Sequence, residues 1–310
     1  MNSSSDRTFL DHWTDWLATD APRRLAPTTV VEYKRQLVAF ARWMETTLTV
    51  SFAPESITSY RIEQYVATLE LQVRGRTRKP ATVNKAVAAL SSLGAWLVEM
   101  GICAASPARR LRTIGDQPGP PKALDPTVVT KLLDAAHHTG DLRDALVLEI
   151  LAFSGMRASE VAAIQVEDLD VGLRTTWVSI VGKGYKRRRV PLPKRVGTIL
   201  QRYLDDRATR EGHRPTHGPL LVGERGGLTR TTINRIVTKV AQCAQITPTE
   251  RAAVTPHAFR HSVATQLVRK RDLVTAADLL GHSSLSTTRR YSKASAQDLE
   301  AAVAALYDPA

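Results

Sequence analysis

The stretch that most constrains the fold is SPARRLRTIGDQPGPPKALDP, residues 106–126, because its composition interrupts both helices and strands. It contains two glycines and five prolines, and each proline fixes φ and lacks a backbone N–H donor. Its four basic residues indicate an extended basic linker, which either follows a phosphate backbone or is a solvated tether. The sequence therefore predicts two domains, residues 1–105 and 126–310, joined by a linker over residues 106–125.

The first domain has the apolar periodicity of helices that share one core. Apolar residues recur at helical spacing in three segments: Phe9, Trp13, Trp16 and Leu17; Tyr33, Leu37, Phe40, Ala41 and Met44; and Val83, Val87, Leu90, Leu93 and Leu97. Gly94 falls on the apolar face of the third segment, where we expect a neighbouring helix to approach closely. A further helix is expected over ITSYRIEQYVATLELQ. The pattern predicts an all-helical domain whose aromatic residues are core rather than a base-stacking surface.

The second domain mixes two periodicities. PTVVTKLLDAAHHTG and DLRDALVLEILAFSG predict helices, whereas TTWVSIV and RVPL predict two strands joined by the turn GKGYKRR. Helices resume at PKRVGTILQRYLDDRAT and continue toward the C-terminus. The expected fold class is mainly α with a small β-sheet, in an α+β second domain.

The charge balance points to a polyanionic partner. Lys and Arg outnumber Asp and Glu by 43 to 30, which gives a net charge of +13. An excess of one sign repels itself unless a partner of opposite charge compensates it. Nucleic acid is the first expectation, an anionic membrane surface the second, and a merely basic protein the third. No apolar run approaches the roughly 20 residues that span a bilayer. The start MNSSSDRTFLDHW has no signal-peptide core, so we expect a cytoplasmic, nucleoid-associated protein.

No cofactor motif stands out. The two cysteines, Cys103 and Cys243, form neither a CxxC pair nor a zinc spacing, and no HExxH, EF-hand or Walker A sequence occurs. We expect reduced thiols, and chemistry that needs no bound metal, nucleotide or other cofactor.

Basic residues cluster in both domains, as expected where both contact one polyanion. GKGYKRRRVPLPKR carries seven basic residues and no acid, and a solvated hairpin is the alternative to a DNA-binding ribbon. VRGRTRKPATVNK is a second acid-free cluster. The candidate DNA contacts here are Lys186, Arg187, Arg188, Arg189, Arg74, Arg76, Arg78, Lys79 and Lys85.

Three further strings carry candidate catalytic residues. In SGMRASEVAAI, Arg157 precedes a helix and either faces an anion or pairs with Glu160 three positions on. In TPHAFRHSVATQL, Thr255 is an N-cap and Pro256 a first helical residue, so His257 and Arg260 share the face of a helix start. His261 is expected about 100° away from Arg260.

The last string, GHSSLSTTRRYS, contains His282, Arg289, Arg290 and Tyr291. A phenol has a pKa of about 10, so it is a poor nucleophile at neutral pH unless cations stabilise the developing charge. Arg157, Arg260, the histidines and Lys183 would provide such cations at a phosphodiester. Arg289 and Arg290 are either phosphate contacts or solvated charges.

Together these boxes, in this order and spacing, resemble the tyrosine recombinase (phage integrase) superfamily, particularly its Xer-type recombinases. The resemblance implies a two-domain, C-shaped clamp around duplex DNA. Residues 1–105 would be a helical, SAM-like core-binding domain and residues 126–310 the catalytic domain. It further implies a DNA recombination enzyme that acts as a tetramer on two DNA sites, in integration, excision or dimer resolution, either alone or with a related recombinase.

The resemblance also implies a role for each site residue. Tyr291 would attack the scissile phosphate and form a 3′-phosphotyrosyl bond, and Lys183 would protonate the leaving 5′-oxygen. Arg157 and Arg260 would bind the non-bridging oxygens. His257 would be the base or support the phosphate, and His282 would hydrogen-bond the phosphate. Glu160 would orient Arg157 or a histidine.

Two other functions remain open at this stage: a type IB topoisomerase-like enzyme that relaxes DNA, and a non-catalytic DNA-binding regulator on the same fold. The C-terminal segment AQDLEAAVAALYDPA places Leu299, Val303 and Leu306 on one stripe. That stripe either docks on a neighbouring subunit or packs on its own domain.

Overall fold

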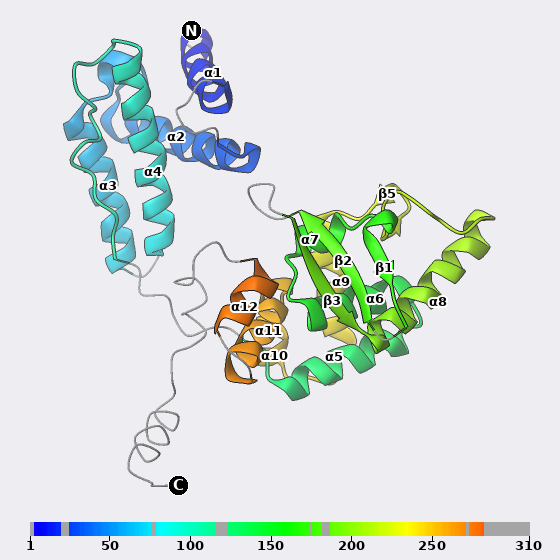
Figure 1. Ribbon diagram of the computed structural model, residues 1–310. Helices are drawn as coiled ribbons and strands as arrows, with labels where there is room; N and C mark the ends of the chain where they lie inside the picture. The colour runs from blue at the N-terminus through cyan, green and yellow to red at the C-terminus, as the bar shows by residue number, and fades with distance from the viewer. Residues whose placement is uncertain are drawn as a thin grey trace, which may run out of the picture. The chain divides into compact units, whose positions relative to one another are not determined.

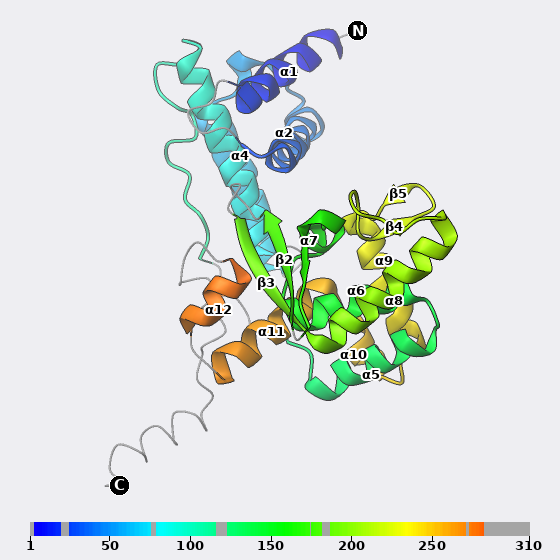
Figure 2. The same cartoon turned by 45° about the vertical axis from the view of Figure 1, so that its right-hand side comes forward.

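A computed structural model describes residues 3–19, 25–75, 79–115, 123–173, 175–181, 187–270 and 273–281. The chain divides into two compact units, Met1–Pro118 and Gly119–Ala310, so the division lies within the proline-rich stretch. Figures 1 and 2 show the elements of each unit from two directions. The prediction of a mainly helical chain with a small sheet in its second part is confirmed.

The described elements of unit 1 are helical. They are α1 (Ser3–Thr19), α2 (Pro27–Leu48), the short 3-10 turn η1 (Pro54–Ser56), α3 (Ser59–Arg74) and α4 (Pro80–Glu99). Side chains from every helix meet in one core, where Trp13, Leu37, Phe40, Ile62 and Leu90 are almost completely buried. The aromatic residues of the predicted apolar stripes lie in this core or pack against it, because burying large apolar side chains is favourable.

Helix α4 is the most apolar element of unit 1. By length and composition alone it would suffice to cross a membrane, contrary to the expectation that no apolar run of the sequence is long enough. Nine of its residues are buried, among them Val83, Leu93 and Leu97, so within this unit α4 is the central helix of a core.

The first part of the predicted linker packs on unit 1. A side-chain carbon at Gly94 would overlap the hydroxyl of Ser106 and lie 3.2 Å from the Cβ atom of Ala108. Gly94 thus admits the segment after α4, and the expectation of a close helix at this position is wrong. The Asn84 side chain exchanges two hydrogen bonds with the backbone of Ile114, at 2.9 and 2.8 Å. These bonds satisfy backbone groups that an extended segment otherwise leaves to water.

Unit 2 begins with α5 (Pro126–His138), α6 (Leu142–Ser154), α7 (Ala158–Ala162) and η2 (Val166–Asp168). An antiparallel sheet follows, in the order β1 (Leu169–Val171), β2 (Thr175–Val181) and β3 (Arg187–Pro193), and then helix α8 (Lys194–Glu211). The hairpin β4 (Val222–Gly223) and β5 (Gly226–Gly227) leads to α9 (Arg230–Cys243), α10 (Pro248–Ala253), α11 (Pro256–Lys270) and α12 (Leu273–Leu280).

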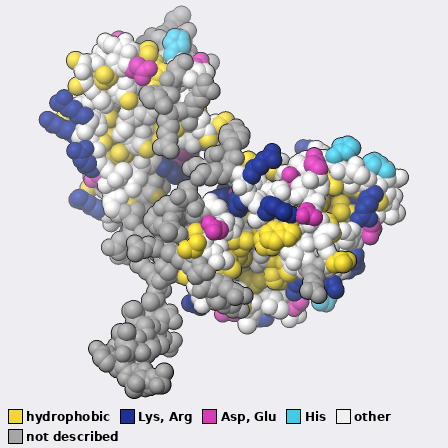
Figure 3. Space-filling model, viewed as in Figure 1, with side chains coloured by type: hydrophobic (Ala, Val, Ile, Leu, Met, Phe, Trp, Pro, Cys, Tyr) yellow, Lys and Arg dark blue, Asp and Glu magenta, His cyan; other side chains and the backbone are white. Residues whose placement is uncertain are grey.

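The three-stranded sheet has one buried and one exposed face. Strand β3 alternates between them, with Val190 and Leu192 buried and Arg187 and Arg189 exposed. Helices α6 and α8 pack behind the buried face (Figure 1). On the outer face Arg189 lies over the ring of Trp177, 5.2 Å from its centroid. In the space-filling view hydrophobic and basic side chains are accordingly mixed over this unit (Figure 3).

The end of α6 determines how the candidate site is built. Gly155 ends this helix with a φ of +62°, a left-handed conformation that favours glycine. A side-chain carbon at Gly155 would lie 2.8 Å from Cδ2 of Leu280 and 3.1 Å from Cγ1 of Val263. The turn at Gly155 therefore brings α6, α11 and α12 together just before Arg157.

Candidate active site

Arg157 and Glu160 form the ion pair that their spacing allows. Arg157 caps the N-terminus of α7, and the Glu160 carboxylate accepts hydrogen bonds from the Arg157 backbone N–H and Nη1, both at 2.8 Å. The Arg157 side chain is 39% exposed, whereas that of Glu160 is 6% exposed. The carboxylate thus holds a guanidinium that remains accessible to an anion.

A second guanidinium binds the same carboxylate. Arg188 donates from Nη1 to one oxygen of Glu160 at 3.1 Å and from Nη2 to the other at 2.9 Å. Burial by itself raises the pKa of Glu160, but the hydrogen bonds from Arg188 and from the Arg157 backbone, with both positive charges, lower that pKa below its ordinary value. Glu160 is therefore a carboxylate shared by two arginines.

Arg260 is buried and ties two helix ends together. It lies on α11, is 2% exposed, and donates from Nη1 to the carbonyl oxygen of Gly155 at 2.7 Å and from Nη2 to that of Leu280 at 2.8 Å. These bonds hold the Arg260 guanidinium against the backbone of Gly155, which precedes Arg157 by two residues. The predicted N-cap of α11 is present, since Thr255 Oγ1 accepts from the backbone N–H of Ala258 at 3.1 Å.

His257 is exposed at the start of α11 and packs on His261. Their rings are 4.2 Å apart between centroids, with an interplanar angle of 72°. Desolvation of the part of the His257 ring that faces the protein lowers its pKa, and the positive charges of Arg260, Arg157 and Arg230 act in the same direction. Burial, with His257 and Arg260, lowers the pKa of His261 to about 4. Both rings are therefore neutral at neutral pH, as a proton acceptor requires.

His261 was missed as a member of this cluster. His261 lies four positions after His257, so the two side chains are neighbours on adjacent turns of α11, where their rings make an edge-to-face contact. The spacing between the two histidines was the available signal.

Several predicted site residues lie outside the described part of the chain. They are Lys183, His282 and Tyr291 among the candidate catalytic residues, and Arg76, Arg78, Lys186, Arg289 and Arg290 among the candidate DNA contacts. Their roles stay predictions. Gly281, which directly precedes His282, is described: it has a φ of +64°, and a side-chain carbon there would lie 2.8 Å from Nη1 of Arg188.

The remaining candidate DNA contacts differ in orientation. Arg74, Lys79, Lys85, Arg187 and Arg189 are exposed. Arg188 instead faces inward, and its side chain is only 12% exposed. Because strand neighbours alternate between faces, the middle of three consecutive arginines had to point away from the other two.

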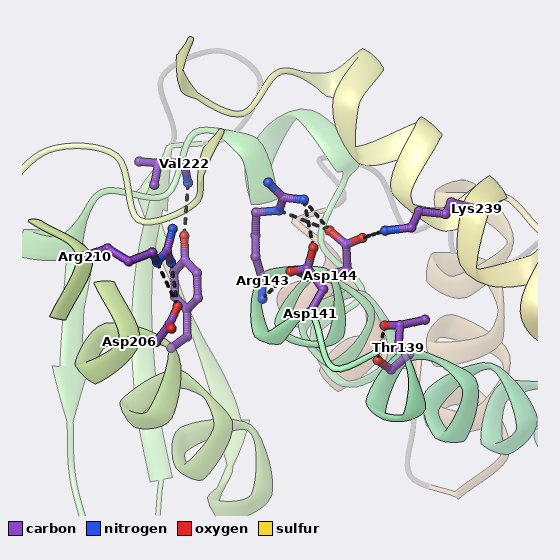
Figure 4. Close-up of polar contacts among 10 residues, drawn as sticks. Thr139, Asp141, Arg143, Asp144, Asp206, Arg210, Val222 and Lys239 are labelled. Carbon is purple, nitrogen blue, oxygen red and sulfur yellow. Dashed lines mark hydrogen bonds and ion pairs between the residues drawn. The ribbon is translucent and has the colours of Figure 1, made fainter. Parts of the chain in front are cut away.

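A separate polar cluster lies at the opposite end of α6 (Figure 4). Asp144 is almost completely buried and binds Arg143 at 2.8 Å and Lys239 at 2.9 Å. A depression of about 620 Å³ beside it is lined by α6, the β4–β5 hairpin and α9. An α-helix rises about 1.5 Å per residue, so the length of the 13-residue helix α6 separates this cluster from Arg157. Within the described residues, no group of three or more His, Cys, Asp or Glu side chains gathers as a metal site would require.

The sequence matches the family described as the Phage integrase family over residues 122–298. The chain is 31% identical over 283 residues to the tyrosine recombinase XerC of Pelobacter propionicus, an alignment that covers 90% of this chain and 89% of that protein. It is 30% identical over 275 residues to the tyrosine recombinase XerD of Listeria monocytogenes, with 87% and 89% covered.

Two solved structures are similar in fold. The site-specific recombinase XerH bound to its difH substrate has a TM-score of 0.69 at 21% identity, over 98% of this chain and 85% of that one. A lambda integrase tetramer bound to a Holliday junction has a TM-score of 0.67 at 17% identity, over 94% and 78%.

Proposed function

Because the chain belongs to the phage integrase family and is a tyrosine recombinase, we propose that Tyr291 attacks a DNA phosphate and forms a 3′-phosphotyrosyl intermediate. The Oη–phosphorus bond forms as the bond from phosphorus to the 5′-oxygen breaks. Such a transesterification conserves the energy of the phosphodiester, and attack by a 5′-hydroxyl on the phosphotyrosine reseals a strand without an external energy source.

The observation that carries this proposal is the convergence of Arg157, His257 and Arg260. They come from segments about 100 residues apart, and Arg260 joins them by binding the carbonyl oxygen of Gly155. Two guanidiniums beside an imidazole suit a phosphate whose negative charge grows as the nucleophile attacks. In the proposed mechanism Arg157 and Arg260 bind the non-bridging oxygens.

The proton transfers follow from the same arrangement. Because its pKa is lowered, the ring of His257 is neutral and can accept the phenolic proton of Tyr291 or support the phosphate. Lys183 donates a proton to the leaving 5′-oxygen, and His282 hydrogen-bonds the phosphate. Glu160 does not contact the substrate in this scheme, and orients Arg157 from behind.

We propose further that the enzyme acts as a tetramer on two duplex DNA sites, within the cytoplasm and on the nucleoid. The support is the likeness to XerH in its DNA complex and to the lambda integrase tetramer on a Holliday junction. Residues 1–105 and 126–310 would contact the same duplex as a clamp. The tetramer would consist of identical subunits or of this chain with a related recombinase.

The test begins with full-length protein and a library of random duplexes, from which bound sequences are recovered. Substrates made from these sequences carry a nick that traps the cleaved strand, and covalent adducts are counted on denaturing gels. We expect adducts with the wild-type chain and none with Tyr291→Phe.

Adduct formation by Tyr291→Phe would show that another residue is the nucleophile. Tight binding without any wild-type adduct would favour the regulator. Relaxation of a supercoiled plasmid that lacks the selected sequence would favour the topoisomerase-like enzyme.

A further inference from the structure

Arg188 occupies the buried face of β3. It alternates with Arg187 and Arg189, which are exposed, and shares its side of the strand with Val190 and Leu192. A guanidinium on this face costs desolvation energy unless each part of it finds an acceptor. Its partners therefore indicate what it does.

Those partners belong to two other segments of unit 2. The two Nη atoms bind both oxygens of Glu160, at 3.1 and 2.9 Å, and Nε donates to the carbonyl oxygen of Leu279 at 3.1 Å. A guanidinium supplies these donors in one rigid plane, whereas a lysine ammonium is a point charge that cannot span the three acceptors.

The backbone of Gly281 lies directly on this guanidinium. A side-chain carbon at Gly281 would be 2.8 Å from Nη1 and 3.1 Å from Cζ of Arg188. Gly281 also has a φ of +64°, a left-handed conformation that favours glycine, so both its backbone conformation and its close contact with Arg188 require the absence of a side chain.

Each segment that Arg188 joins leads to a candidate catalytic residue. Glu160 holds Arg157, Gly281 immediately precedes His282, and Arg188 itself follows Lys183 by five residues. We propose that Arg188 is a positioning residue: it holds β3, α7 and the end of α12 in one arrangement, so its loss slows DNA cleavage without weakening DNA binding. The inference rests on the proposed function, and replaces the expected DNA contact at this position.

The first experiment separates cleavage from binding. With a nicked substrate selected as above, we would measure the dissociation constant and the single-turnover rate of adduct formation at saturating DNA. For Arg188→Gln we expect a rate about 10- to 100-fold lower, by analogy with the loss of hydrogen-bond partners that orient the ligands of a catalytic metal. Arg188→Lys should recover only part of this loss, and the dissociation constants of both variants should stay within about twofold of wild type.

Arg207 offers a matched control. It is also a buried arginine of unit 2, bound to both oxygens of Glu211 at 2.8 and 3.0 Å and to the carbonyl oxygens of Pro219 and Leu220. Arg207→Gln should lower the melting temperature as Arg188→Gln does, yet leave the rate at saturating DNA unchanged below the melting transition. Equal slowing by both substitutions would show that Arg188 is merely structural, and a weaker affinity with an unchanged rate would make it a DNA contact. Either result overturns the proposal.

A second measurement needs no activity. In the free full-length protein, Arg188→Gln should speed amide hydrogen exchange in α7 and at Leu280 and Gly281, whereas Arg207→Gln should not. If exchange there stays at the wild-type rate, Arg188 does not hold these segments and the proposal is wrong. If exchange changes as expected but the wild-type chain forms no adduct, the positioning contact stands and the proposed function fails.

Discussion

At the scale of single residues, the site is organised around the buried carboxylate of Glu160. Its two oxygens bind two arginines, one accessible and one turned inward. The spacing of Arg157 and Glu160 predicted the first pair from the sequence, because residues three apart are neighbours at a helix start. The pairing of Glu160 with Arg188, 28 positions away, required the tertiary structure.

The proposed role of Lys183 as general acid can be tested with a substrate whose leaving group needs no proton. Lys183→Ala should slow cleavage at saturating DNA by about 100-fold, within the usual contribution of general acid catalysis. A substrate with a 5′-phosphorothiolate at the scissile position should restore most of the rate, because a thiolate leaves without a proton. The substitution should leave the dissociation constant nearly unchanged. Slow cleavage of the sulfur substrate as well would assign the proton to another group.

The histidine pair predicts how stability depends on pH. Folding lowers the pKa of His261 from 6.5 to about 4, so between these values the unfolded chain binds more protons than the folded chain. The contribution of the neutral His261 to stability is therefore fully present above pH 6.5 and is lost as the pH falls toward 4. Carboxylates also titrate there, so the measurement is the difference in melting temperature between wild type and His261→Asn. We expect this difference to shrink on acidification, and a constant difference would contradict the shift.

At the scale of elements, the described residues of the candidate site lie mostly at the ends of helices. The end of α6, the starts of α7 and α11 and the end of α12 meet around Gly155, Arg260 and Arg188. Apolar periodicity predicted α6, and the Thr255–Pro256 cap predicted the start of α11, because these signals are local. The contacts between their ends could not be predicted, because they depend on how the helices pack.

Gly155 provides the test at this scale. Gly155→Ala combines a positive φ with contacts of 2.8 Å to Leu280 and 3.1 Å to Val263. We expect a loss of about 2–4 kcal/mol in the free energy of unfolding, measured with urea. Gly140→Ala is the control, since Gly140 has a φ of +72° but no atom within 4 Å of an added carbon. Its expected cost is about 1 kcal/mol, from the backbone alone. Equal losses would mean that the contact around Gly155 relaxes freely.

At the scale of the whole molecule, the charge and the two-part organisation point to a DNA partner. The net charge of +13 and the exposed basic residues of both units agree with binding to one polyanion. The boundary between the two compact units lies after Pro118, inside the proline-rich stretch, and the first part of that stretch packs on unit 1 through Ala108 and Ile114. Composition predicts where a chain is extended, but not which surface the extended segment covers.

The C-terminal stripe of Leu299, Val303 and Leu306 predicts assembly. A chain that ends at Lys293 keeps Tyr291 but lacks this stripe. In sedimentation on DNA carrying the selected site, we expect the truncated chain to remain a monomer or dimer where the full chain forms a tetramer. An unchanged tetramer would place the stripe on its own domain.

The sequence by itself determined the helices, the small sheet and the family motifs. All of these depend on residue types at short spacing, where periodicity, caps and prolines act directly. Only the tertiary structure decided which acceptors Arg188 binds and that Arg260 is buried between two helix ends. Those outcomes depend on which acceptors lie within reach after the helices have packed, and a linear pattern does not carry that information.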